Sequence, residues 1–78
     1  MTTSIYQQAL TITKDYLGPA AERFINRQIT FHLQKKPELL GKEDIPQLAE
    51  WVKVSIAILT EDKQMVDDFT KRILKLKK

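Results

Sequence analysis

The chain contains no cysteine and a single histidine, His32. Without thiols, neither a disulfide framework nor a thiolate metal site can form. A nucleophilic triad would need His32 as its base, and neither of the two serines, Ser4 and Ser55, lies in a nucleophile-elbow context. His32 also lacks the second histidine of the common metal motifs, and no acid-rich calcium loop is present. We therefore expect no catalytic residue, no metal, no cofactor and no small-molecule substrate, and do not expect an enzyme.

Long apolar runs are also lacking. No stretch approaches the roughly 20 apolar residues of a membrane-spanning helix. The first twenty residues lack the basic segment and the unbroken apolar segment of a signal peptide. We therefore expect no membrane span and a cytoplasmic location. The 78 residues are enough for one helical domain over 1–78, and a chain of this size buries only about 60–65% of the surface of its unfolded form.

The alternation of apolar and polar residues that is typical of strands does not occur between turn residues. Apolar residues instead recur at helical spacing in four stretches, at about 4–17, 19–36, 45–59 and 61–76. Short connections between helices favour antiparallel neighbours. The sequence therefore predicts an all-α fold, either a four-helix bundle or a crossed four-helix array.

The stretch 45–59 is apolar on two sides. One continuous face consists of Ile45, Leu48, Ala49, Val52, Ile56 and Leu59. Trp51, Val54 and Ile58 share helical spacing on nearly the opposite side. A helix that is apolar on two sides is either enclosed by its own domain or forms half of a contact with another chain. Because Trp is enriched at interaction hot spots, these three residues are candidates for a partner-binding surface, and the alternative is that they belong to the core.

A second candidate surface consists of Phe31 and His32. His32 follows Gln28 by four residues, and both fall inside the apolar arc of the helix expected at 19–36. One interpretation is a half-buried histidine that bonds Gln28 or a backbone carbonyl. The other is a recognition or pH-sensing position inside an apolar groove.

Residues that commonly begin and end helices mark the expected boundaries. Ser4 has capping-box spacing to Gln7. Gly18 suits the left-handed position after a helix, and Pro19 suits the first residue of the next one. We expect Asp44 and Thr60 to cap the two later helices.

Positive charge is concentrated at the C-terminal end. Residues 1–70 carry eight Lys or Arg and all ten acids, a net charge of −2, whereas residues 71–78 carry five bases and no acid. This distribution supports an alternative function, weak nucleic-acid binding by the Arg face of the second helix and the basic tail. The bases in question are Arg23, Arg27, Lys35, Lys36, Lys71, Arg72 and Lys75. The interleaved acids favour the simpler interpretation of solvated helix faces.

Residues 16–25, YLGPAAERFI, resemble the hydrophobic-Gly-Pro-hydrophobic-Ala opening of a small helical module. That module is appended to bacterial signalling proteins such as serine/threonine kinases and response regulators. The likeness continues through Leu48-Ala49 and into the last helix, so that it spans residues 12–74. Ala20 stands where a bulkier residue is expected and the basic tail is not part of the pattern, so no site residue is transferred beyond the Gly-Pro corner. The resemblance implies a regulatory or adaptor role without catalysis.

The sequence thus predicts a small non-catalytic module for protein–protein interaction or self-association, with a protein partner or a homo-oligomer. A regulatory or adaptor role in bacterial signalling is what the resemblance adds. Nucleic-acid binding is the alternative.

Overall fold

A computed structural model describes residues 4–77, and every regular element in this range is helical. Three α-helices have 12 to 15 residues: α1 (Ile5–Leu17), α3 (Ile45–Leu59) and α4 (Lys63–Leu74). Their bounds lie close to the ranges expected from the sequence. Short 3₁₀ turns η3 (Pro37–Leu39) and η4 (Lys42–Asp44) precede α3, and η5 (Lys75–Lys77) follows α4. No helix in 4–77 has the length and apolar character needed to cross a membrane.

The helix expected at 19–36 is instead a composite segment. A 3₁₀ turn, η1 (Gly18–Ala20), leads into a seven-residue α-helix, α2 (Ala21–Arg27), which continues as a π-helical turn, η2 (Gln28–His32). The all-α expectation is confirmed, but the expectation of a four-helix bundle is not, because the α-helical part of this segment has only seven residues and the three long helices are α1, α3 and α4.

The composite segment ends four residues earlier than expected, at His32, and its end has a physical reason. Gln34 adopts a left-handed conformation with φ 55°, the geometry that commonly terminates a helix. The Lys35 N–H then donates to the Ile29 carbonyl oxygen at 3.3 Å. Lys36 precedes a proline, which disfavours helical backbone, and it is extended, with ψ 141°.

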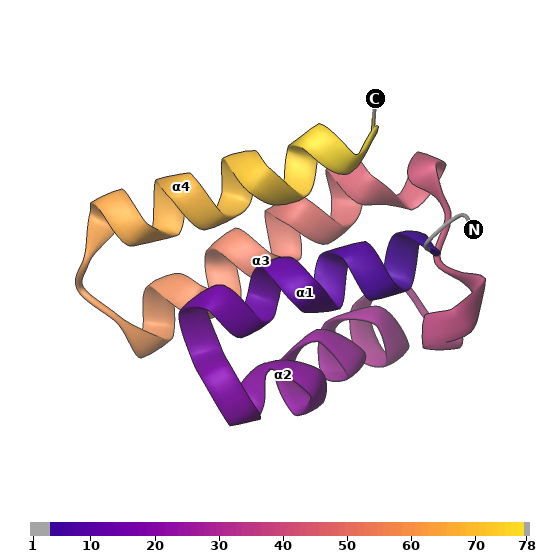
Figure 1. The fold of residues 1–78 in the computed structure, drawn as a ribbon, viewed down its shortest axis with the longest axis horizontal. Coiled ribbons are helices and arrows are strands. Elements are labelled where there is room, and N and C mark those ends of the chain that lie inside the picture. The colour runs from indigo at the N-terminus through magenta and orange to yellow at the C-terminus, as the bar shows by residue number, and fades with distance from the viewer. Residues whose placement is uncertain (1–3, 78) are drawn as a thin grey trace.

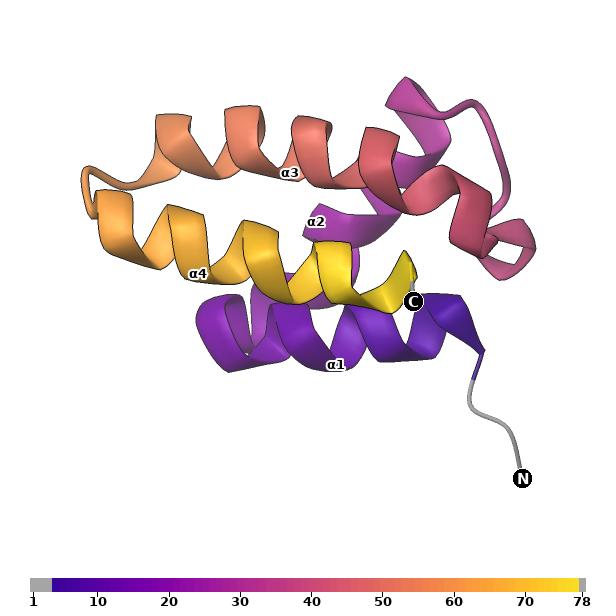
Figure 2. The ribbon, with the colours of Figure 1, turned by 90° about the horizontal axis from the view of Figure 1, so that it is seen from above.

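The helices pack in the order that Figures 1 and 2 show. α3 and α4 lie side by side, connected by a short turn, and α1 packs against both α2 and α4. The π turn η2 packs against α3. The composite segment therefore contacts α3 mainly through its second half, and this geometry leaves space between α2 and the end of α3.

The core lies between these helices. Phe69 of α4 is fully buried, stacks on Tyr16 with ring centroids 4.8 Å apart and meets Phe24 at 6.4 Å. The other buried apolar residues are Ala9, Leu10, Ala21, Ile25, Ile29, Leu40, Ile45, Leu48, Ala49, Val52, Ile56, Val66 and Ile73. The predicted core face of α3 is confirmed for five of its six residues, and the exception, Leu59, is exposed.

The helix caps agree with the sequence at α1 and differ at the two later helices. The Ser4 hydroxyl accepts from the Gln7 N–H at 3.1 Å, and Gly18 ends α1 with φ 57°. Asp44 makes no side-chain cap to α3, because its carboxylate binds Lys35 instead. The N-cap of α4 is Asp62, whose carboxylate accepts from the Met65 N–H at 3.1 Å.

Candidate partner-binding groove

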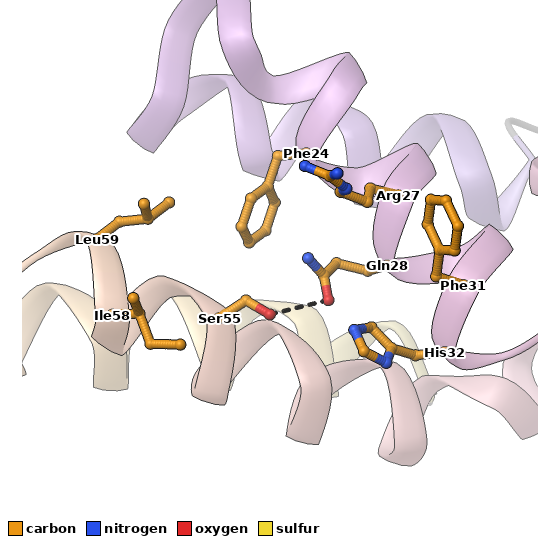
Figure 3. A pocket seen from close by; sticks show the side chains of 8 residues that line it. All are labelled: Phe24, Arg27, Gln28, Phe31, His32, Ser55, Ile58 and Leu59. Carbon is orange, nitrogen blue, oxygen red and sulfur yellow. Dashed lines mark hydrogen bonds between the residues drawn. The ribbon is translucent and has the colours of Figure 1, made fainter.

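A groove of about 470 Å³ runs between the composite segment and α3. Five of its lining side chains project from α2 and η2, and three project from α3 (Figure 3). The lining residues are Phe24, Arg27, Gln28, Phe31, His32, Ser55, Ile58 and Leu59. We call this feature the α2–α3 groove. It combines two residues from the predicted partner surfaces of the composite segment, Phe31 and His32, with one from the predicted surface of α3, Ile58.

A hydrogen bond between side chains closes the floor of the groove. The Ser55 hydroxyl donates to the Gln28 Oε1 at 3.0 Å (Figure 3). Gln28 is only 4% exposed, and a buried amide oxygen without a partner would be costly. The bond therefore holds α3 against η2 at one position in the groove. His32 is half-buried, as the first interpretation expected, but Gln28 bonds Ser55 and not His32.

A stacked pair closes one end of the groove. The imidazole of His32 lies 3.9 Å from the Trp51 ring, centroid to centroid, with an angle of 10° between the planes. Trp51 is half-buried under His32 and does not line the groove itself. The structure thus gives this predicted anchor residue a supporting position: it fixes the ring of His32, which does line the groove.

The rim of the groove is apolar and open to solvent. The exposed fraction is 67% for Phe31, 80% for Ile58 and 66% for Leu59. Val54, one helical turn before Ile58, is 51% exposed and continues the apolar strip along α3 without lining the groove. Single exposed apolar residues are ordinary, but several of them around one concave site are typical of an interaction surface.

Five of the eight lining residues were not among the predicted partner-binding residues: Phe24, Arg27, Gln28, Ser55 and Leu59. The sequence predicted Leu59 on the continuous apolar face of the helix at 45–59 and Arg27 on a possible nucleic-acid surface, and it did not single out Phe24. Helical periodicity shows that Leu59 lies on the same side of α3 as Ile56, but it does not show whether another element covers that side. Here the composite segment does not cover the last turn of α3, so Leu59 remains exposed.

The π turn explains the position of Phe31. In an α-helix each residue advances by about 100°, and the i→i+5 bonds of a π turn close a wider turn, so each residue advances by less. Phe31, seven residues after Phe24, is therefore rotated away from the face that Phe24 occupies. The ring lies at the outer edge of the groove instead of in the core. Such π turns are frequent at functional sites.

The charge of the groove is positive. Its eight lining residues include one guanidinium, that of Arg27, and no carboxylate. The Cζ atom of Arg27 lies 5.8 Å from the centroid of the Phe31 ring. Arg23, one turn earlier on α2, lines a neighbouring hollow together with Arg27 and Phe31, and no acid lines that hollow either.

Two other predicted nucleic-acid residues are engaged in ion pairs with acids. Lys35 Nζ lies 2.8 Å from Asp44 Oδ2. The hydrogen bond to Asp44 raises the pKa of Lys35. Partial burial by itself would raise the pKa of Asp44, but the hydrogen bonds from Lys35 and from the Gly41 N–H outweigh burial and lower it.

Arg72 forms the second ion pair, with its Nη2 atom 2.8 Å from Asp15 Oδ2. Its guanidinium also donates to the Tyr16 hydroxyl at 3.4 Å. The bonds to Tyr16 and then to Asp15 raise the pKa of Arg72. This contact fixes α4 to α1 and lies apart from the groove. Three further predicted bases, Lys36, Lys71 and Lys75, lie outside the groove and are exposed. The seven predicted nucleic-acid residues are therefore spread over several elements.

Within residues 4–77, no three His, Asp or Glu side chains come together as a possible metal site. Comparisons with protein families, with curated proteins and with solved structures found no match to the chain.

Proposed function

We propose that this chain is a non-catalytic protein-interaction module that binds a partner segment in the α2–α3 groove. The observation that carries the proposal is the group of exposed apolar side chains around a concave site, with Ile58 80% exposed at its rim. A domain of this size gains most of its stability from burying such side chains. An apolar group left open beside a groove is therefore better explained by binding than by folding.

The shape of the groove favours a helical partner segment. Two helical elements, the composite segment and α3, form its walls (Figure 3). Amphipathic helices bind such grooves by placing apolar residues at i, i+3 or i+4, and i+7 into them. The Gln28–Ser55 bond and the His32–Trp51 stack hold the two walls before any partner arrives, and a preformed site lowers the entropic cost of binding.

The biological context of the proposal comes from the resemblance of residues 16–25 to a module appended to bacterial signalling proteins. In that context the module acts as a cytoplasmic regulatory or adaptor element, and its partner is another protein or a second copy of the chain. Nucleic-acid binding has less support, because Lys35 and Arg72 are already paired with acids.

The test is a comparison of proteins captured from a lysate of the source cells by three immobilised forms of the chain. Ile58→Gln removes an apolar side chain from the rim. Leu39→Gln is the matched control, since Leu39 is 63% exposed but does not line the groove. We expect a protein retained by the wild type and by Leu39→Gln to be lost with Ile58→Gln. Equal retention by all three forms would contradict the proposal.

A further inference from the structure

We infer that the α2–α3 groove selects an amphipathic helix of another protein that carries carboxylates beside its apolar stripe, one helical turn apart. This inference rests on the proposed function and adds the chemistry of the partner. Three features of the groove carry it: the absence of acids among its lining residues, the unpaired guanidinium groups of α2, and the way Phe31 orients one of them.

The first feature is a wall with charge of one sign. The lining residues of the groove and of the adjoining hollow include Arg23 and Arg27 but no Asp or Glu. Positive charge along one edge of an apolar site attracts a ligand with negative charge at the matching edge. A purely apolar helix would make no favourable electrostatic contact with these arginines.

The second feature is the state of the arginines. Among residues 4–77, the ion pairs are Lys35–Asp44 and Arg72–Asp15. Neither Arg23 nor Arg27 pairs with a described acid, and both are exposed. Their charges are therefore available to a ligand without breaking an internal ion pair.

The third feature is the contact between Arg27 and Phe31. The guanidinium lies over the Phe31 ring at 5.8 Å, a cation–π contact. A guanidinium that uses its face for an aromatic ring keeps the N–H donors at its edge for a carboxylate, which it can bind with two parallel hydrogen bonds. Phe31 thus supplies apolar surface to the partner and also holds the group that recognises its charge.

The spacing of the arginines sets the spacing of the carboxylates. Arg23 and Arg27 are four residues apart on α2, which is α-helical over this range. Four residues correspond to a rise of about 6 Å. A partner helix lying along α2 matches both guanidinium groups when it has two acids at i and i+3 or i+4.

The same charges argue against a second copy of this chain as the occupant. A twofold contact through the groove would place the same positively charged patch of both chains in one interface, and no Asp or Glu among the lining residues could pair with it. Like charges placed together at an interface are destabilising. Another protein with acidic residues meets no such repulsion.

The experiment is a selection from a displayed library of 16-residue helical peptides on four immobilised forms of the full chain. These are the wild type, Ile58→Gln, Arg27→Glu and Lys71→Glu. Lys71 is exposed on α4 and does not line the groove, so Lys71→Glu changes the net charge by the same amount as Arg27→Glu. Single-stranded DNA binding and light scattering of the wild type are measured in parallel.

We expect the wild type and Lys71→Glu to enrich the same peptides, with an apolar stripe and paired Asp or Glu one turn apart beside it. Arg27→Glu should enrich the apolar stripe with Lys or Arg at one of those positions. In a selected peptide, replacing both acids by Gln should weaken binding to the wild type about fivefold, which corresponds to two exposed ion pairs.

The outcomes separate the two proposals. If Ile58→Gln enriches the same peptides as the wild type, or no apolar stripe is enriched, the groove does not bind helices and the proposed function fails. If the peptides enriched on the wild type have an apolar stripe but no acids, the inference is wrong and the proposed function is still supported. The same holds if Arg27→Glu enriches peptides with the same acids as the wild type. Displacement of selected peptides by DNA, or a wild-type dimer that Ile58→Gln dissociates, would also overturn it.

Discussion

Two isoleucines on α3, two residues apart, give a direct test of which surface this chain reserves for a partner. Ile56 is fully buried and Ile58 is 80% exposed. The same substitution, to alanine, should therefore act on folding at Ile56 and on binding at Ile58. Each variant serves as the control of the other, because helix, residue type and chemical change are the same.

The magnitudes follow from burial. Ile56→Ala should lower the free energy of unfolding by about 2–5 kcal/mol, a large part of the roughly 4–12 kcal/mol expected for a domain of this length. Ile58→Ala removes three carbons that are mostly in water, so stability should stay the same or rise by a few tenths of a kcal/mol from the better helix propensity of alanine.

Binding should respond in the opposite way. At about 0.8 kcal/mol per buried CH₂ group, and with 80% of Ile58 available for burial, the loss on binding is about 2 kcal/mol, roughly a 25-fold weaker Kd. Urea unfolding followed by circular dichroism gives the stability, and fluorescence anisotropy of a peptide selected on the wild type gives the affinity. A loss of stability with Ile58→Ala comparable to that with Ile56→Ala would refute the reasoning, as would an unchanged Kd.

Three further predictions follow from local contacts. Gln34→Gly should raise the free energy of unfolding by about 1 kcal/mol, because Gln34 is left-handed and exposed; an unchanged or lower melting temperature would contradict this. Ser55→Ala should lower it by about 1–3 kcal/mol, since Gln28 Oε1 loses its partner in a buried position, and the double variant with Gln28→Leu should recover much of the loss in urea unfolding. The lowered pKa of Asp44 contributes stability that is present above the ordinary pKa of an aspartate and is lost as the pH falls through the lowered value. Asp44→Asn should therefore flatten the acid side of the stability–pH curve, and an unchanged acid side would show that the bond to Lys35 contributes little.

Helical periodicity predicted the features that a single helix determines by itself, namely its approximate range and the position of its apolar face. The stripe on α3 identified Ile45, Leu48, Val52 and Ile56 as buried residues, because a helix with one apolar face packs that face inward. It did not identify Leu59 as exposed, since exposure depends on the length and path of another segment.

The other differences between the predicted and the observed structure depend on contacts between residues far apart in the sequence or on turn geometry that no sequence pattern indicates. Asp44 has the residue type and spacing of an N-cap, but Lys35 lies within hydrogen-bonding distance in space and binds its carboxylate. The π turn at Gln28–His32 has no sequence pattern that would separate it from an α-helix. That turn determines where Phe31 lies, so the groove could not be assembled from the sequence although Phe31, His32 and Ile58 were each selected from it.

The central claim is that a partner helix lies between the composite segment and α3. The most direct measurement is a titration of the ¹⁵N-labelled chain with a selected peptide, followed by amide chemical shifts. We predict the largest shifts at groove residues such as Phe31, Ser55 and Ile58, and none at Leu39. Shifts confined to α1 and α4, with the groove unchanged, would contradict the account.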